Sequence, residues 1–255
     1  MRPKLEILEQ ELVDRIVAEA YELLWDPGVR VYREGALRVL AEGGATVDFE
    51  KKIAQIHQDM IEEALKTAPG SVDIHDLKGE LRLHLEGDNV YFYPGATALQ
   101  IIDPVTDEYR PPVTEDLVRF IQVVEGLPQI DAQAGSLLCA DVPKMVSDSY
   151  RYYLMLLYGT KPLCGGAFSI EGWYPMKDLL VAYFGSEEAI AARPVNTMAI
   201  CPSPPLLWSE ITCQNLVDCA RYGLPVELVS MPLAGATAPA TLVSALAQHT
   251  AENLS

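Results

Sequence analysis

The chain has 255 residues, of which 49% are hydrophobic and 22% are charged, so it is long enough to form one large globular domain or two smaller ones. Its net charge of −17 disfavours nucleic-acid binding, which needs a basic surface, and electrostatic attachment to an anionic membrane. No uncharged apolar run approaches the roughly 18 residues that span a bilayer, and the charged N-terminus lacks the apolar segment of a signal peptide. The five cysteines are odd in number and have no CxxC spacing, which is typical of a cytoplasmic protein without disulfides.

The first half of the chain predicts helices followed by β-hairpins. Apolar residues recur at helical spacing from Leu5 to Leu24 and stop at Asp26-Pro27-Gly28. Further along, alternating apolar and polar residues indicate strands. The expected elements are helices over 5–24, 33–42 and 51–66 and strands over 72–75, 81–85 and 99–102, the last paired with a strand near Tyr109. We assign residues 1–112 to an N-terminal region of helices and hairpins.

From Thr114 the pattern becomes an alternation of strands and helices. Thr114 stands where a helix N-cap is expected, and Glu115 and Asp116 favour the positive end of the helix dipole. Strands are expected over 130–139, 162–168, 195–201 and 226–230, and helices over 147–158, 175–183, 187–192, 209–222 and from residue 240. Spacing of about 30 residues suits βαβ units. Residues 113–255 therefore predict an α/β fold of the TIM-barrel type, as the first half of a (β/α)8 barrel whose active site lies at the carboxyl ends of the strands.

About four βα units make only half of such a barrel, and four strands would leave an open sheet edge. The chain ends at Ser255 inside a predicted helix without a stop signal. Either the chain is the N-terminal portion of a longer protein or a second copy closes the barrel. We favour a truncated chain, which we expect to be inactive alone and to form a homo-oligomer at full length. The remaining alternative is a non-catalytic half-barrel that acts as a binding module.

Three segments of the chain together resemble the trimethylamine methyltransferase family. They are Tyr93-Pro-Gly-Ala-Thr97, Lys161-Pro-Leu-Cys-Gly-Gly166 and Ser230-Met-Pro-Leu-Ala-Gly-Ala-Thr-Ala-Pro239. The resemblance covers essentially all 255 residues, and the last segment is its most specific part. It implies a TIM-barrel enzyme that moves a methyl group from trimethylamine or a related methylated or quaternary amine to the Co(I) of a separate corrinoid protein. The cofactor would then be supplied by the partner, with none bound tightly by this chain.

Demethylation of an amine requires a site that holds an ammonium group and excludes water. Aromatic rings attract such cations, and several follow the predicted strands. Phe168, Trp173 and Tyr174 follow the second strand and Trp208 follows the third, while Tyr93 lies in the family-like hairpin segment. We expect these rings to bind the substrate. The alternative for each ring is core or loop packing.

Two other features complete the expected site. Asp141 follows the first strand of the repeat and could pair with a cation, or it could be a solvated loop acid or a helix cap. Gly235, Ala236 and Thr237 follow the fourth strand and are small enough for a flat macrocycle to approach, so we expect this loop to face the corrinoid. The alternative for the loop is a turn that caps the next helix. No cluster of histidines, cysteines and acids suggests a metal site.

Other enzyme classes that use a TIM barrel, such as aldolases and lyases, stay open because a fold does not fix a function. They would need a catalytic lysine at a strand end. The second half has only Lys144, Lys161 and Lys177, none of which stands in the last residues of a predicted strand. Glycine-rich patterns for binding nucleotide phosphates are missing as well.

Overall fold

The computed structural model describes residues 6–255, so the start of the first predicted helix at Leu5 lies outside the described residues. The chain forms two compact units. The first consists of residues up to 68, 200–214 and 228–255, and the second of residues 69–199 and 215–227. Helix α8 (Glu210–Tyr222) begins in the first set of residues and ends in the second. The division between residues 112 and 113 that the sequence suggested stays a prediction.

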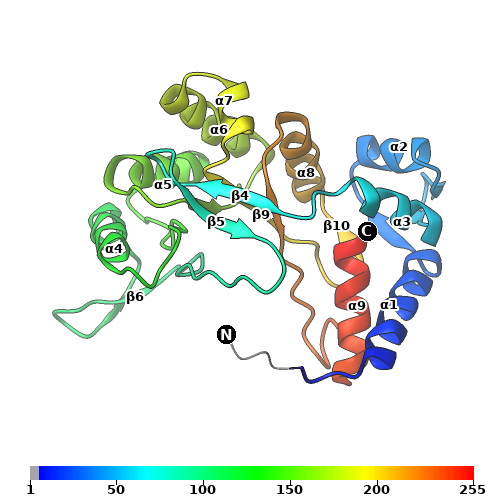
Figure 1. Cartoon of the computed structure of the whole chain (residues 1–255). Helices are drawn as coiled ribbons and strands as arrows, with labels where there is room; N and C mark the ends of the chain where they lie inside the picture. Colours follow the sequence, from blue (N-terminus) through cyan, green and yellow to red (C-terminus); the bar gives the residue numbers. More distant parts are fainter. Residues whose placement is uncertain (1–5) are drawn as a thin grey trace. The chain divides into compact units, whose positions relative to one another are not determined.

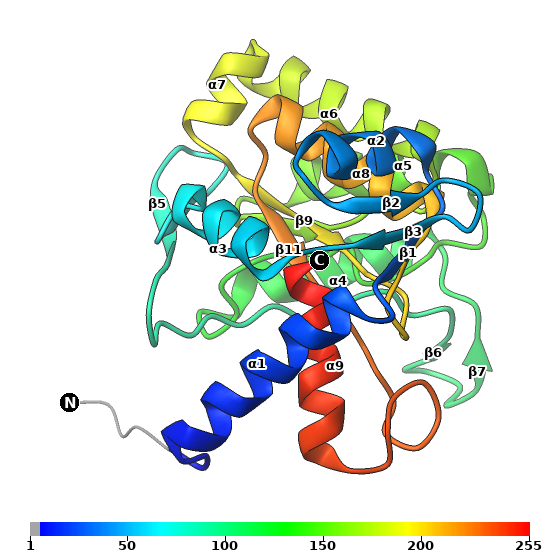
Figure 2. The same ribbon diagram turned by 90° about the vertical axis from the view of Figure 1, so that its right-hand side faces the viewer.

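The first unit contains a small mixed sheet and two long helices. Its sheet has the order β10-β1-β3-β2, in which β10 runs parallel to β1 and the other pairs are antiparallel. Helix α1 packs along helix α9, as both views show (Figures 1 and 2). The elements of this unit are α1 (Gln10–Trp25), β1 (Val29–Val31), α2 (Glu34–Glu42), β2 (Thr46–Asp48), β3 (Ile53–Gln55), α3 (Gln58–Thr67), β10 (Leu207–Trp208) and α9 (Leu242–Leu254).

The close packing of α1 and α9 follows from residues at helical spacing. Ile16, Ala20 and Leu24 are buried on α1, four residues apart, and Ala247 and Ala251 are buried on α9 with the same spacing. Residues that are four apart lie on one face of a helix, and small alanine side chains let two helices approach. The third helix begins at Gln58 instead of residue 51, because Ile53 and Ala54 pair with strands on both sides of β3. Here tertiary pairing overrides the helical pattern.

The second unit contains two hairpins, a parallel sheet and the helices around it. Strands β4 and β5 pair antiparallel, as do β6 and β7, which confirms the predicted hairpins (Figure 1). The elements are β4 (Val72–His75), β5 (Leu81–Leu85), β6 (Ile101–Ile102), β7 (Tyr109–Arg110), α4 (Thr114–Gly126), the 3-10 turn η1 (Lys144–Val146), α5 (Ser147–Tyr158), β8 (Leu163–Gly165), α6 (Ile170–Phe184), α7 (Glu187–Ala192), β9 (Asn196–Ile200) and β11 (Val226–Leu228).

The parallel sheet has the order β11-β9-β8, which confirms an α/β fold with βα units. The described residues form no closed barrel, so the barrel stays a prediction. The strand expected over 130–139 is wrong, because Gly135 takes a left-handed backbone angle of φ 53° that interrupts an extended chain. Among the described residues, two isolated parallel bridges form here instead of a strand, Gln133 with Leu163 of β8 and Leu137 with Ala98. None of the described helices is long and apolar enough to cross a membrane.

Helix α6 begins at Ile170, five residues before the predicted start. Ser169 is its N-cap, and its hydroxyl accepts a hydrogen bond from the backbone N–H of Gly172 at 2.9 Å. Pro175 stands inside the helix, near its beginning. The early start moves Trp173 and Tyr174 from the loop where the sequence put them onto the first turns of the helix.

Candidate functional site

The family-like segment Tyr93–Thr97 of the second unit runs beside residues 131–138, with backbone hydrogen bonds from the residues that flank it. The Tyr93 hydroxyl donates a 2.7 Å hydrogen bond to Glu227 Oε1 on β11. Ser136 Oγ donates to the carbonyl oxygen of Gly95 at 2.6 Å. The backbone N–H of Ala98 donates to the Ser136 carbonyl at 2.7 Å, and this region forms a parallel bridge with Leu137. The segment is therefore fixed both to residues 136–137 and to strand β11.

A buried ion pair lies beside this segment. Arg151 of α5 donates through Nη1 to the Gly135 carbonyl at 2.9 Å and to Thr97 Oγ1 at 3.3 Å, and its Nη2 lies 3.5 Å from Asp148 Oδ1. Asp148 Oδ2 accepts the backbone N–H of Phe168 at 2.7 Å. Burial lowers the pKa of the Arg151 guanidinium and raises the pKa of the Asp148 carboxyl. The pair therefore connects α5 to the chain at Gly135 and to Phe168 in the loop after β8.

The sheet has two different faces at this point. Met198 of β9 accepts a hydrogen bond from the Tyr152 hydroxyl of α5, so alternate residues of β9 face the helices. On the opposite face, the Cys164 thiol donates to Glu227 Oε2 at 3.2 Å. Burial, followed by the charge of Glu227, raises the pKa of Cys164 to about 12. We call Tyr93, Cys164 and Glu227 the inner-face cluster.

Two residues of the second family-like segment, Lys161–Gly166, stabilise the fold. The buried Lys161 donates from Nζ to the carbonyl oxygens of Val124, Leu127 and Ile130 at 2.6, 2.7 and 2.6 Å. It thereby caps the end of α4, where carbonyl groups lack helical partners. A Cβ atom on Gly166 would lie 2.4 Å from the Ala199 carbonyl oxygen, so this residue lets β8 and β9 approach.

Only one of the three aromatic residues expected after the second strand lies beside the buried ion pair. The Phe168 ring is half exposed, and the guanidinium carbon of Arg151 lies 4.8 Å from its centroid. Trp173 is 1% exposed, and its ring packs edge-on against Tyr174 and near Tyr222, with Nε1 donating to Cys219 Sγ at 3.4 Å. The Tyr174 hydroxyl donates to Asp218 at 3.3 Å. The structure thus brings Phe168 to the strand ends and gives Trp173 core packing.

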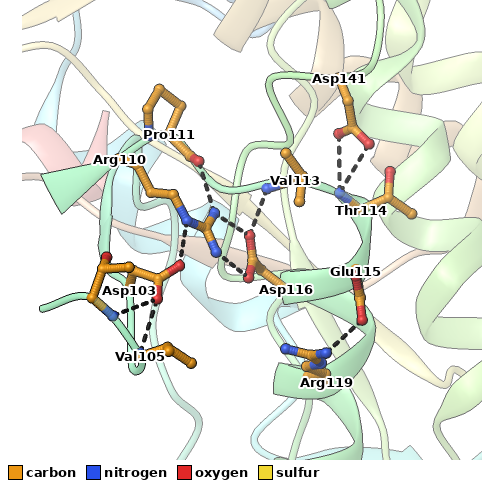
Figure 3. Close-up of polar contacts among 11 residues, drawn as sticks. Asp103, Val105, Arg110, Pro111, Val113, Thr114, Glu115, Asp116, Arg119 and Asp141 are labelled. Atoms are coloured by element: carbon orange, nitrogen blue, oxygen red, sulfur yellow. Dashed lines mark hydrogen bonds and ion pairs between the residues drawn. The ribbon is translucent and has the colours of Figure 1, made fainter. Parts of the chain in front are cut away.

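Asp141 lies at the beginning of α4, where its carboxylate accepts the backbone N–H of Thr114 at 3.0 and 3.2 Å (Figure 3). The N-cap is Val113 instead of Thr114, and Asp116 accepts the Val113 N–H at 2.8 Å. Arg110 links this helix end to the β6–β7 hairpin through ion pairs with Asp116 and Asp103, both at 2.7 Å. Asp141 therefore has the contacts of a helix cap.

The other expected residues belong to the first unit. Trp208 lies on β10 instead of in a loop; it is 4% exposed, and its Nε1 donates to Ser255 Oγ at 2.7 Å. The loop that contains Gly235, Ala236 and Thr237 folds back on Leu233, whose carbonyl accepts N–H groups of Ala236 and Thr237. Gly235 has a φ of 80°, and space around its Cα is open. These residues form an exposed turn.

Sequence reasoning missed three residues of the second unit's site, namely Asp148, Arg151 and Glu227. Glu227 is the only acid in the apolar segment 224–233, which is a signal that could have found it. Arg151 and Asp148 lie on helix α5, and only their burial, at 4% exposure each, reveals them.

The family model described as trimethylamine methyltransferase (MTTB) matches residues 1–255 of the chain. The chain belongs to this family. Among curated relatives of this trimethylamine methyltransferase family member, the trimethylamine methyltransferase MttB of Desulfitobacterium hafniense is 28% identical over 91% of the chain and 47% of the relative. A glycine betaine methyltransferase of the same species is 26% identical over 99% of the chain and 52% of the relative. MttB of Methanosarcina barkeri is 26% identical over 92% of the chain and 48% of the relative.

A solved structure of the monomethylamine methyltransferase MtmB of Methanosarcina barkeri has the same fold over 97% of the chain and 50% of its own length, with a TM-score of 0.64 and 11% identity. The chain thus spans about half the length of the relatives that it matches. In this family member, the second unit holds the Tyr93–Glu227 pair and, beside the Arg151–Asp148 ion pair, the half-exposed Phe168 ring. Such groups can hold and orient a small cation.

Proposed function

We propose that the protein to which this chain belongs transfers a methyl group from a methylated amine to the Co(I) of a corrinoid, which a separate protein carries. Family membership and the names of the relatives support the reaction class. The observation that carries the proposal is the hydrogen bond between Tyr93 of the family-like segment and Glu227, the middle residue of the short strand β11. In α/β folds ligands bind outside the carboxyl ends of the parallel strands, and β11 is one of these strands.

The chain's own residues would bind and orient the amine. Tyr93 and Phe168 are 40% and 51% exposed, so both rings have free surface for a methylated cation. During transfer the C–N bond breaks and its electron pair stays on nitrogen, so trimethylammonium leaves as dimethylamine. The Co(I) of the acceptor supplies the two electrons of the new bond to the methyl group and becomes Co(III).

The loop at Gly235–Thr237 is compatible with a flat acceptor. A Cβ atom added to Gly235 would meet no other atom within 4 Å, and Ala236 is exposed. We keep this loop as the proposed corrinoid-facing surface, with the corrinoid brought by the partner and none held by this chain.

The test uses the complete protein as its gene encodes it. It is mixed with a corrinoid protein in the Co(I) state and with isotopically labelled trimethylamine, glycine betaine or monomethylamine. We expect label to appear on the corrinoid protein and the Co(I) absorption to disappear for at least one amine. If no methylated amine donates its methyl group, the proposal is wrong.

An aldolase or lyase function is less well supported. Such enzymes need a lysine amine that can attack a carbonyl group, which requires its neutral form. Lys161 precedes β8, which begins at Leu163, so it lies away from the carboxyl end, and its Nζ donates to three carbonyl oxygens at 2.6–2.7 Å. Three such bonds use all three hydrogens of an ammonium group.

A further inference from the structure

A cavity of about 360 Å³ lies along helices α1 and α9 of the first unit, which run side by side (Figures 1 and 2). Its lining residues on α1 recur at spacings of three and four, so they share one face of that helix. Leu206, in the loop after β9, also lines it. Small-molecule sites commonly have volumes of roughly 300–1,000 Å³, so the cavity is large enough for a small ligand.

Most of the cavity wall is apolar. Ile16 of α1 and Ala247 of α9 are 6% and 7% exposed. Leu12, Leu23 and Val243 also line the cavity and keep part of their surface exposed. A ligand that covers these side chains removes apolar surface from water, which is favourable. The wall therefore fits a ligand with an apolar body.

Gln248 provides a fixed hydrogen-bond acceptor in this cavity. The side chain is 7% exposed, and its Nε2 donates to the Thr237 carbonyl and to Glu252 Oε1, both at 2.8 Å. Because both partners are acceptors, the reversed amide orientation would place oxygen against oxygen. Gln248 Oε1 has no partner among the described residues, and it is not one of the unpartnered atoms that are sealed from solvent. An N–H or O–H group of a ligand in the cavity can reach it.

Two opposite charges of α1 line the same cavity. Arg15 and Glu19 are exposed and four residues apart, a spacing at which ion pairs can form on a helix. On α2 this spacing gives the pair between Glu34 and Arg38 at 2.6 Å, with the acid first in sequence. On α1 the order is reversed, which is the less favourable one, and the described residues include no ion-pair partner for Arg15 or Glu19. Both charges are therefore available to a ligand.

We infer that this cavity binds an apolar α-amino acid. The ligand carboxylate pairs with Arg15, its ammonium group donates to Glu19 and to Gln248 Oε1, and its side chain covers the apolar wall. Residues four apart are about 6 Å apart along a helix axis, so two long side chains can contact the two charges of one small zwitterion. The site belongs to the first unit, and the inference does not depend on the proposed methyl transfer.

The first experiment measures binding to the complete protein by calorimetry. L-Leucine is compared with three molecules that each lack one of its groups. Isocaproate lacks the ammonium group, isoamylamine lacks the carboxylate and glycine lacks the apolar side chain. We expect leucine to bind most tightly, and each of the other three to have a Kd that is at least about threefold higher. If leucine does not bind, or if isocaproate binds equally well, the inference is wrong.

Three variants test the residues that line the cavity. Arg15→Gln and Glu19→Gln each remove one exposed charge, and Ser244→Leu fills the cavity from an exposed position on α9. Glu11→Gln removes an exposed charge of α1 that does not line the cavity, and it is the matched control. Thermal unfolding confirms that each variant is folded. Because the charges at 15 and 19 are exposed and unpaired, their removal should not unfold the protein.

The charge variants should discriminate between the ligands. Arg15→Gln should raise the Kd of leucine roughly threefold to tenfold and leave that of isoamylamine, which has no carboxylate, unchanged. Glu19→Gln should weaken leucine and isoamylamine but not isocaproate. Ser244→Leu should abolish binding of leucine, and Glu11→Gln should have no effect. Unchanged affinity for leucine in both charge variants, or in a folded Ser244→Leu variant, would overturn the inference.

Competition and hydrogen exchange distinguish this cavity from the site proposed for methyl transfer. Saturating trimethylamine should leave the Kd of leucine unchanged, and leucine should slow amide exchange in α1 and α9. Competition between the two molecules, or protection that is confined to the second unit, would place leucine elsewhere and overturn the inference. Failure of methyl transfer with every amine would overturn the proposed function and leave the binding of leucine standing.

Discussion

Tyr93 and Glu227 are 134 positions apart in sequence and are joined by a 2.7 Å hydrogen bond. The bond connects the loop after the β4–β5 hairpin with the last strand of the parallel sheet. Because Glu227 also accepts the Cys164 thiol of β8, three separate segments meet at one carboxylate. The loop after the β4–β5 hairpin therefore contributes Tyr93 to the candidate site, although this loop lies outside the βα repeat.

Substitution of Gly166 by alanine should destabilise the parallel sheet. The new methyl group would lie 2.4 Å from the Ala199 carbonyl oxygen, which is backbone and cannot rotate away. Overpacking of this kind costs about 1–3 kcal/mol. We expect a lower midpoint in urea or thermal unfolding.

Gly126→Ala is the matched control for this substitution. A Cβ atom at Gly126 would meet nothing within 4 Å, and the residue lies in the last turn of α4. Alanine should be neutral or slightly stabilising there because it loses less backbone entropy than glycine. Equal effects of the two substitutions would contradict the close approach of β8 and β9.

Truncation of Trp173 should cost much more stability than truncation of Phe168. Trp173→Ala removes a ring that is 1% exposed and should cost about 3–5 kcal/mol of stability. Phe168→Ala removes a ring that is 51% exposed and should cost less than about 1 kcal/mol. Unfolding midpoints of the two variants check the difference. A Phe168 variant that is folded but binds methylated amines less tightly would support Phe168 as a binding residue.

The stability of the β6–β7 hairpin should depend on pH through the Asp103 carboxyl. Hydrogen bonds from Arg110, Val105 and Thr106 lower its pKa from 3.8 to about 2. Because the pKa is lowered in the folded protein, these contacts stabilise the hairpin fully above pH 3.8, and their contribution is lost as the pH falls toward 2. NMR titration of the carboxyl carbon measures the pKa directly.

Arg110→Gln tests the cause of this shift. We expect the pKa of Asp103 to rise toward its ordinary value, since the first cause is removed and two backbone donors are left. Asp48, whose pKa is lowered by its contacts with Lys51, is the control and should keep its value. A pKa of Asp103 that stays near 2 in Arg110→Gln would assign the shift to the backbone N–H groups.

Much of the fold could be predicted because its signals are local. Helix α5 was predicted from residues 147–158 and α7 from 187–192, the bounds that the structure has, since period and capping residues mark their ends. The early start of α6 could not be read in this way, because Pro175 resembled a first helical residue. Strand β3 was missed, since its pairing with β1 joins segments whose contact no local pattern encodes.

The site was predicted less well for the same reason. The family-like segments led to Tyr93, which contacts Glu227 of β11, while the aromatic residues after the strands included Trp173 and Trp208, both core residues. Aromatic side chains occur both in cores and in binding sites, and the sequence does not show whether a given ring is buried or exposed. Glu227 stands out in the sequence as the only acid of segment 224–233, but its partners Tyr93 and Cys164 lie far away in the chain and only the structure shows them.

The buried carboxylate of Glu252 should stabilise the conformation of the two loops that follow β9 and β11. It is 1% exposed on α9, and it accepts the Leu206 backbone N–H at 3.0 Å, Gln248 Nε2 at 2.8 Å and the Ser230 hydroxyl. Leu206 has a φ of 49°, a left-handed conformation that costs energy for a residue with a side chain. The bond to Glu252 helps to hold it there.

Glu252→Ala removes the acceptor for three buried donors at once, so we expect a loss of roughly 2–4 kcal/mol. Glu252→Gln keeps the shape but turns an N–H₂ group toward at least one of these donors, and it should cost less than alanine. Hydrogen exchange of the Leu206 amide is the decisive measurement, because this N–H loses its acceptor directly. We expect its exchange to accelerate in both variants and to stay unchanged in Glu42→Gln, an exposed control. If both Glu252 variants exchange as slowly as the wild type, other contacts hold the loop after β9, and Glu252 serves only the packing of α9.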